Sequence, residues 1–219
     1  ATFTDAAGIN NTENYDPPAL TQDMWYKRLV TADVGGATCT EETPVIKVTV
    51  INFTPGSISS DQTICSGDTP NPLTSITPSG DGSFTYLWEE STDNSNWVNA
   101  AGTNDEETYT PAALTQDMYY RRQVTAEVGG QTCTEVTNVV TITVNNVTPG
   151  VIAGEETICE GATPAGLTTA TAATGDGLLT YQWQSSSDGT SYFNITGATT
   201  ADYNPSALTA DTWYKRIAT

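Results

Sequence analysis

Residues 109–130 read YTPAALTQDMYYRRQVTAEVGG, and the first part of this stretch decides how the whole chain is organised. It recurs as YDPPALTQDMWYKR from Tyr15 and as YNPSALTADTWYKR from Tyr203, so each copy begins 94 residues after the one before it. Solenoid repeats span only about 20–50 residues, whereas a segment of this length can bury a core of its own. The period therefore predicts a row of tandem domains.

The boundary between copies lies at a repeated Thr-Pro-Gly, within NFTPG at 52–56 and NVTPG at 146–150. Proline is excluded from central strands, and Pro-Gly marks a turn or joint. We expect the C-terminal part of one repeat at 1–54, a complete repeat at 55–148 and the N-terminal part of the next at 149–219. Both ends fall inside repeats, so we expect a piece of a longer polypeptide. The joints contain no long Gly/Ser spacer, which predicts a semi-rigid rod.

Short stretches that alternate apolar and polar residues predict strands rather than helices. Such stretches are TPVIKVTVIN at 43–52 and TNVVTITVNN at 137–146. FTYLWEES and LTYQWQSS place a Tyr and a Trp two residues apart, on one face of a strand, which makes Trp88 and Trp183 candidate core residues. We expect an all-β fold of tandem antiparallel β-sandwich domains joined by short linkers.

The composition excludes several classes of function. The net charge is −19, from 26 acidic and 7 basic residues, so nucleic acid and anionic membranes are not expected partners. Histidine is absent, and no catalytic or zinc motif is present. We therefore expect no enzyme activity, no catalytic, cofactor-binding or metal residues, and no direct membrane insertion. Calcium binding at the acidic loops stays an open hypothesis, although no D-x-D-x-D-G loop is present to supply the oxygen ligands.

Six of the seven basic residues form one adjacent pair in each repeat: Lys27-Arg28, Arg121-Arg122 and Lys215-Arg216. Neighbouring strand residues point to opposite faces, so one member of each pair shares the face of Tyr120. One interpretation is a row of cations that binds an acidic glycan or surface. The other is that arginine stems cover aromatic rings while the guanidinium groups pair with nearby groups. Under the second interpretation Arg122 belongs to the core.

The position of Trp88 resembles that of the core Trp of immunoglobulin-type domains. LTQDMYY, which ends at Tyr120, resembles the Leu-to-Tyr corner of immunoglobulin and fibronectin type III folds, where a Tyr hydroxyl bonds back to the backbone. By that match Tyr120, Tyr26 and Tyr214 are the corner residues. The Cys expected two residues after that Tyr is replaced by Arg122, which excludes the antibody-type disulfide.

The succession TICSGDTPNPL, TYLWEESTDNSNW, YTPAALTQDMYYRR and GGQTCTEVTNVVTITV is more specific. It resembles the immunoglobulin/PKD-like repeats of large Bacteroidota surface proteins, such as the gliding-motility adhesin SprB and other adhesins exported by type IX secretion. The resemblance covers essentially the whole chain. It implies an extracellular location at the cell surface and an adhesive or filament-forming role.

Two cysteines per copy in such a secreted array indicate one disulfide per unit. Pairing within a unit joins Cys65 to Cys133. Pairing across a joint joins Cys39 to Cys65 and Cys133 to Cys159. We favour Cys65–Cys133, because it ties the first strand of the sandwich to the last.

Three functions follow from these observations. The first is a structural and adhesive repeat region of a large bacterial surface protein or filament, acting in adhesion or gliding. Its expected partners are neighbouring repeats of the same chain, with surface polysaccharide and other cell-surface proteins as open candidates. The second is a glycan-binding module that uses Trp97, Tyr192 and Phe193. The third is a spacer in a secreted multidomain enzyme.

Overall fold

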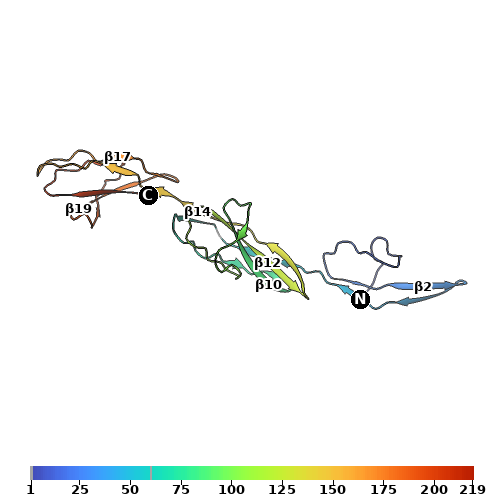
Figure 1. The fold of residues 1–219 in the computed structure, drawn as a ribbon. Helices are drawn as coiled ribbons and strands as arrows, with labels where there is room; N and C mark the ends of the chain where they lie inside the picture. Colours follow the sequence, from blue (N-terminus) through green and yellow to red (C-terminus); the bar gives the residue numbers. More distant parts are fainter. Residues whose placement is uncertain (1, 60) are drawn as a thin grey trace.

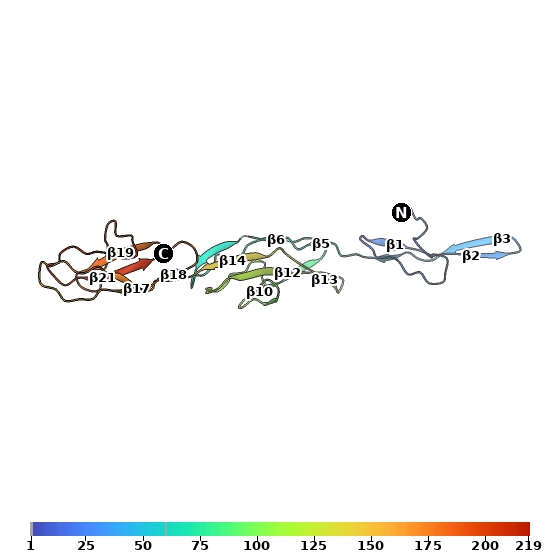
Figure 2. The ribbon, with the colours of Figure 1, turned by 90° about the horizontal axis from the view of Figure 1, so that it is seen from above.

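A computed structural model describes residues 2–59 and 61–219 of the chain. These residues form strands and connecting loops, and no helix occurs among them. Two perpendicular views show the chain drawn out as a row of three bodies (Figures 1 and 2). We call them unit 1 (2–54), unit 2 (55–148) and unit 3 (149–219). The protein is all-β, with tandem immunoglobulin-like units and short connections, as the sequence predicts.

Unit 2 is built on a six-stranded sheet in the order β11-β10-β12-β14-β7, with β13 added on the side of β12. Every pair in this sheet is antiparallel except β7 with β14, which run parallel. Two short pairs, β5 with β9 and β6 with β8, lie opposite this sheet. The strands are β5 (Phe53–Thr54), β6 (Ser57–Ile58), β7 (Gln62–Cys65), β8 (Ser75–Ile76), β9 (Ser79–Gly80), β10 (Ser83–Ser91), β11 (Val98–Asn99), β12 (Met118–Val128), β13 (Gln131–Val136) and β14 (Val140–Asn145).

The central strand β12 shows why this sequence forms a sandwich. Tyr120, Arg122, Val124 and Ala126 are buried, and the residues between them are partly exposed. This two-residue period places one face of the strand in the core. Gly129, in a left-handed conformation, then starts the turn into β13.

Three aromatic rings in contact form the centre of unit 2. Trp88 is fully buried and stacks on Tyr109 at 5.6 Å, and Tyr109 packs against Tyr120 at the same distance. The Trp88 indole donates its N–H to the Glu106 carbonyl at 2.9 Å, so this buried donor is satisfied. Trp88 and Tyr120 therefore lie in the core.

Unit 3 repeats this arrangement around a smaller core. Trp183 is fully buried and packs against Tyr203, which in turn packs against the half-buried Tyr214. The strands are β15 (Val147–Thr148), which leads in from unit 2, and β16 (Val151–Ala153), β17 (Thr168–Thr171), β18 (Thr174–Gly175), β19 (Tyr181–Ser186), β20 (Phe193–Asn194) and β21 (Trp213–Ala218).

Unit 1 corresponds to the second half of a repeat, and its aromatic residues are less covered. Tyr26 is half-buried and packs against Tyr15 at 5.7 Å. Its strands are β1 (Met24–Tyr26), β2 (Leu29–Val34), β3 (Ala37–Glu42) and β4 (Ile46–Val48).

The corner hydrogen bond expected of Tyr120, Tyr26 and Tyr214 is not formed within the described residues. Another tyrosine makes a comparable bond in two of the units. The Tyr109 hydroxyl donates to the Ala101 carbonyl at 2.8 Å, and its counterpart Tyr15 does the same in unit 1. Tyr120 packs its ring instead, and burial raises the pKa of its hydroxyl.

Candidate functional site: the joints between units

The chain passes from one unit to the next at two joints, Asn52–Gly56 (joint 1) and Asn146–Gly150 (joint 2). At each joint the connecting residues form strand pairs with the unit that follows. Phe53 pairs with Gly80 in β9, and Val147 pairs with Gly175 in β18. The joints are therefore paired backbone rather than free linker.

A carboxylate of the following unit holds the first residue of each joint. The Asn52 backbone N–H donates to Asp81 Oδ2 at 3.0 Å, and the Asp81 N–H donates to the Asn52 carbonyl at 2.9 Å. At joint 2, Asn146 and Asp176 make the same two bonds, both at 2.9 Å. These bonds are exposed to solvent, so each is worth about 0.5–1.5 kcal/mol.

A carboxylate of the preceding unit binds the backbone two residues before the asparagine that begins each joint. Asp23 accepts a hydrogen bond from the Val50 N–H at 2.9 Å, and Asp117 accepts one from the Val144 N–H at 2.7 Å. Asp23 also forms an ion pair with Lys47 at 2.6 Å. The hydrogen bond from Lys47, and then that from Val50, lower the pKa of Asp23.

These contacts leave little free backbone at the crossing. At joint 1 the last amide held by unit 1 and the first held by unit 2 belong to Val50 and Asn52. At joint 2 the corresponding amides belong to Val144 and Asn146. Carboxylates of successive units thus bind backbone amides that are only two residues apart.

The glycine of each Thr-Pro-Gly is required by its backbone conformation. Gly56 and Gly150 both have a φ of 71°, in the left-handed region. A Cβ at Gly56 would lie 2.1 Å from the Ile76 carbonyl oxygen, and one at Gly150 would lie 2.3 Å from that of Thr171. The strand must therefore turn at a residue without a side chain.

A buried arginine reaches the proline of the joint from the core. Arg122 donates from Nη2 to the Pro55 carbonyl at 3.1 Å and from Nη1 to the Glu107 carbonyl at 2.6 Å. Its guanidinium lies 4.8 Å from the ring of Tyr86 and 5.7 Å from that of Trp88. Burial lowers its pKa, and its Nε has no partner among the described atoms. Such a burial is tolerable because two carbonyls and two aromatic faces surround the charge.

Unit 3 contains the same arrangement. Arg216 donates to the Pro149 carbonyl at 3.2 Å and to the Ala201 carbonyl at 2.6 Å, and it lies over Tyr181 and Trp183. The inward member of each basic pair in units 2 and 3 is therefore a core residue.

The outward members lie against aromatic rings. Arg121 lies 4.3 Å from the Trp97 ring and forms an ion pair with Glu89 at 2.6 Å. Lys215 lies 4.3 Å from the Tyr192 ring. One face of Trp97 and of Tyr192 is thus covered by the protein's own cation. Among the three aromatics proposed for glycan stacking, this leaves Phe193, which is 72% exposed, as the open one.

The cysteines require a correction. All four thiols are free and exposed, and the predicted Cys65–Cys133 bond is wrong for geometric reasons. Cys133 lies level with Ala126, eight residues along β12 from Met118. Cys65 lies level with Asn145, which is three residues beyond the partner of Met118 in the opposite direction. Extended strand rises roughly 3.3 Å per residue, so the two levels are roughly 36 Å apart. A disulfide needs Cα atoms within about 7 Å of each other.

The alternative cross-joint bonds are excluded in the same way. Cys39 lies on the β2–β3 hairpin, which points away from unit 2, whereas Cys65 lies at the far end of unit 2 (Figure 2). By the repeat, Cys133 and Cys159 are related to each other as Cys39 is to Cys65. Any disulfide within such an array must therefore join cysteines in pairs other than these.

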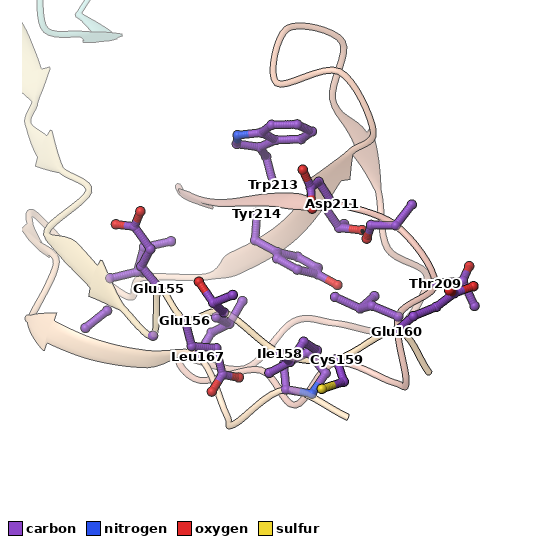
Figure 3. A pocket seen from close by; sticks show the side chains of 18 residues that line it. Glu155, Glu156, Ile158, Cys159, Glu160, Leu167, Thr209, Asp211, Trp213 and Tyr214 are labelled. Atoms are coloured by element: carbon purple, nitrogen blue, oxygen red, sulfur yellow. Dashed lines mark hydrogen bonds between the residues drawn. The ribbon is translucent and has the colours of Figure 1, made fainter. Parts of the chain in front are cut away.

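Unit 3 carries an open groove of about 860 Å³, which runs between the segment after β16 and the start of β21 (Figure 3). Ile158, Leu167 and Tyr214 contribute apolar walls, and Glu155 and Glu160 lie at its rim. In unit 2, β14 occupies the corresponding position between β12 and β7. The groove therefore lies where unit 2 has the sheet strand β14.

No cluster of three or more metal-ligating side chains occurs in the part of the chain that the structure describes. The loop carboxylates of Asp93 and Asp188 are engaged by their own loops. Asp93 Oδ1 accepts the backbone N–H groups of Asn96 and Ser95 at 2.7 and 2.9 Å. These bonds hold the pKa of Asp93 far below its usual range, and the backbone N–H of Asn96 makes the largest contribution. No helix among the described residues is long and apolar enough to cross a membrane.

Comparison with known proteins identifies the family. No curated protein matches the sequence. Among solved structures, the three N-terminal domains of the bacteriophage RB49 Highly Immunogenic Outer Capsid protein (Hoc) are similar at 13% identity and a TM-score of 0.38, over 94% of this chain and 79% of that one. A family model described as a domain of unknown function, DUF8696, matches residues 54–146 and 148–219. Because these two matches cover more than half of the chain, the protein belongs to the DUF8696 family.

Proposed function

We propose that the chain is a stiff, non-catalytic segment of a repeat array, which sets the distance and orientation of whatever lies beyond it. One observation carries this proposal. At each joint, a carboxylate of the preceding unit and a carboxylate of the following unit bind two backbone amides that lie two residues apart. A freely jointed array would need unpaired linker residues at the crossing. The same contacts recur at both joints, which supports a regular arrangement of successive units.

Small-angle scattering of the three-unit chain tests this proposal directly. A stiff row gives a distance distribution with a long tail and a scattering curve that one rigid arrangement reproduces. A chain with flexible joints needs an ensemble of arrangements and has a smaller maximum dimension. The matched comparison is a variant with the four residues Gly-Ser-Gly-Ser inserted between Asn52 and Phe53. Indistinguishable curves for the two chains would overturn the proposal.

We further propose that the array is displayed outside the cell, as an adhesive or filament-forming region of a bacterial surface protein of the SprB-like kind. The supporting features are the acidic charge of −19, which keeps a long array soluble, and a core that repeats without any recurrent catalytic set. Neighbouring repeats are its first partners. Labelling of intact cells of the source organism with an antibody against unit 2 tests the location, and labelling only after permeabilisation would contradict it.

A further inference from the structure

Unit 2 carries one cysteine toward each of its ends. Cys65 ends β7 beside Asn145, next to joint 2. Cys133 lies on the β12–β13 hairpin, which reaches back over joint 1. A recess of about 600 Å³ is lined by Cys133 on one side and by residues 49–51 of unit 1 on the other. The β12–β13 hairpin of unit 2 therefore lies against the segment that follows β4 of unit 1.

The repeat indicates which strand belongs in this recess. Ile51 precedes Asn145 by one period of 94 residues, and the register partner of Asn145 in unit 2 is Cys65. One edge of the 49–51 segment faces β1, since Asp23 accepts the Val50 N–H. The opposite edge is the one on which a β7 strand pairs. A preceding β7 would thus end beside Ile51, with its cysteine at the recess that Cys133 lines.

We infer that a disulfide crosses each joint, between the β7 cysteine of one unit and the hairpin cysteine of the next unit. In this chain Cys65 and Cys159 offer the first type of thiol, and Cys39 and Cys133 offer the second. All four thiols are exposed, so each is accessible to a cysteine of a neighbouring unit. The partner in each case is a neighbouring unit of the same array.

The chemistry requires a disulfide oxidant, such as glutathione disulfide or a thiol oxidoreductase. The two thiols release two protons and two electrons as their Sγ–Sγ bond forms. The electrons cleave the disulfide of the oxidant to two thiols, which take up the protons. Only the supply of this oxidant in the organism rests on the proposed extracellular location. An experiment with added glutathione disulfide therefore tests the pairing separately from the location.

The decisive experiment completes unit 3. Thr219 corresponds to Thr125, so a second copy of residues 126–148 is appended after Thr219 in the full chain. Cys133→Ser is introduced so that the peptide with the appended cysteine can be distinguished from the original copy. After oxidation with glutathione disulfide and proteolysis without reduction, we expect a cross-linked peptide that joins Cys65 to the appended cysteine. Linkage of the appended cysteine to Cys159, linkage of Cys39 to Cys65, or four free thiols would each overturn the inference.

The control adds Cys65→Ser to the same chain. The cross-linked peptide should disappear completely, and the appended cysteine should then react with iodoacetamide. If the appended cysteine instead becomes linked to Cys159, pairing within a unit is the favoured alternative and the inference fails.

A second test needs no added residues. In the 219-residue chain, an Ile51→Cys variant places a thiol at the recess that holds Cys133. It should form a bond with Cys133 under mild oxidation, whereas the matched Val45→Cys variant, at an exposed position farther from the joint, should not. Equal cross-linking of both variants, or of neither, would contradict the placement of the hairpin.

Discussion

The guanidinium of Arg122 donates a hydrogen bond to the carbonyl of Pro55, 3.1 Å away and 67 residues earlier in the chain. Arg216 makes the same bond to Pro149 at 3.2 Å. A charged side chain in the centre of each of these units thus fixes the residue at which the chain enters that unit. Core and joint are one structure, and a change in either should be measurable in the other.

Replacement of Arg122 by alanine should therefore destabilise unit 2 strongly. The variant loses two charge-assisted hydrogen bonds and leaves two carbonyls without a donor, which should cost about 3–5 kcal/mol in free energy of unfolding. Guanidinium denaturation followed by tryptophan fluorescence measures the loss. Arg121→Ala is the matched control, because its ion pair is partly exposed and should contribute about 1 kcal/mol or less. Equal losses for the two variants would contradict the assignment.

Asp81→Ala should loosen joint 1 without unfolding unit 2. The carboxylate accepts the Asn52 N–H, and its removal leaves that amide without this hydrogen-bond acceptor. Hydrogen exchange at the Asn52 amide should accelerate about fivefold, in line with a hydrogen bond worth about 1 kcal/mol. Asp105→Ala, at an exposed loop position, should leave the exchange rate unchanged.

The turn at Gly56 should tolerate no side chain. In Gly56→Ala the new Cβ meets the Ile76 carbonyl oxygen at 2.1 Å, so the backbone of the joint must shift. Gly102→Ala is the control, because Gly102 has a φ of 79° with nothing within 4 Å of the new atom. It should show only the left-handed strain of about 1–2 kcal/mol, seen as a small fall in Tm. A fall in Tm for Gly56→Ala no larger than the control would show that the joint is deformable.

Acid should destabilise the loop at Asp93 in a defined range. The pKa of Asp93 is lowered in the folded protein, chiefly by the backbone N–H of Asn96, so folding favours its charged form. Its contribution is fully present above the ordinary aspartate pKa of about 3.9 and is lost as the pH falls from there toward the lower folded value. Unfolding measured between about pH 2 and pH 6 should show a shallower pH dependence for Asp93→Ala than for the unchanged chain. An identical slope would mean that the loop bonds do not form in solution.

The sequence predicted the fold well because the fold depends on local patterns. Alternation in β12 places Tyr120 and Arg122 on the inner face, and the spacing of Tyr86 and Trp88 does the same in β10. These features need no knowledge of how distant strands are ordered. The period of 94 residues likewise follows from comparison of the chain with itself.

The cysteine pairing was wrong because it depends on strand direction. First and last strands of a sandwich are neighbours, and that much suggested Cys65 with Cys133. But β7 and β14 run parallel, which carries Cys65 to the exit of the unit, while the β12–β13 hairpin carries Cys133 past the entrance. The Gly129-Gly130 turn was visible in the sequence, and counting back from it places Cys133 opposite Ala126. The partner of Arg122 was not predictable, because Pro55 is brought to it only by the turn at Gly56.

The parallel pairing of β7 with β14 also has a mechanical consequence. Because the chain enters unit 2 at one end and leaves at the other, a pull on the array draws these two strands in opposite directions along their length. The register from Gln62 with Ile142 to Cys65 with Asn145 is then loaded in shear, so its hydrogen bonds resist together rather than opening one at a time. A row of such units can transmit tension from one end to the other while each core stays folded.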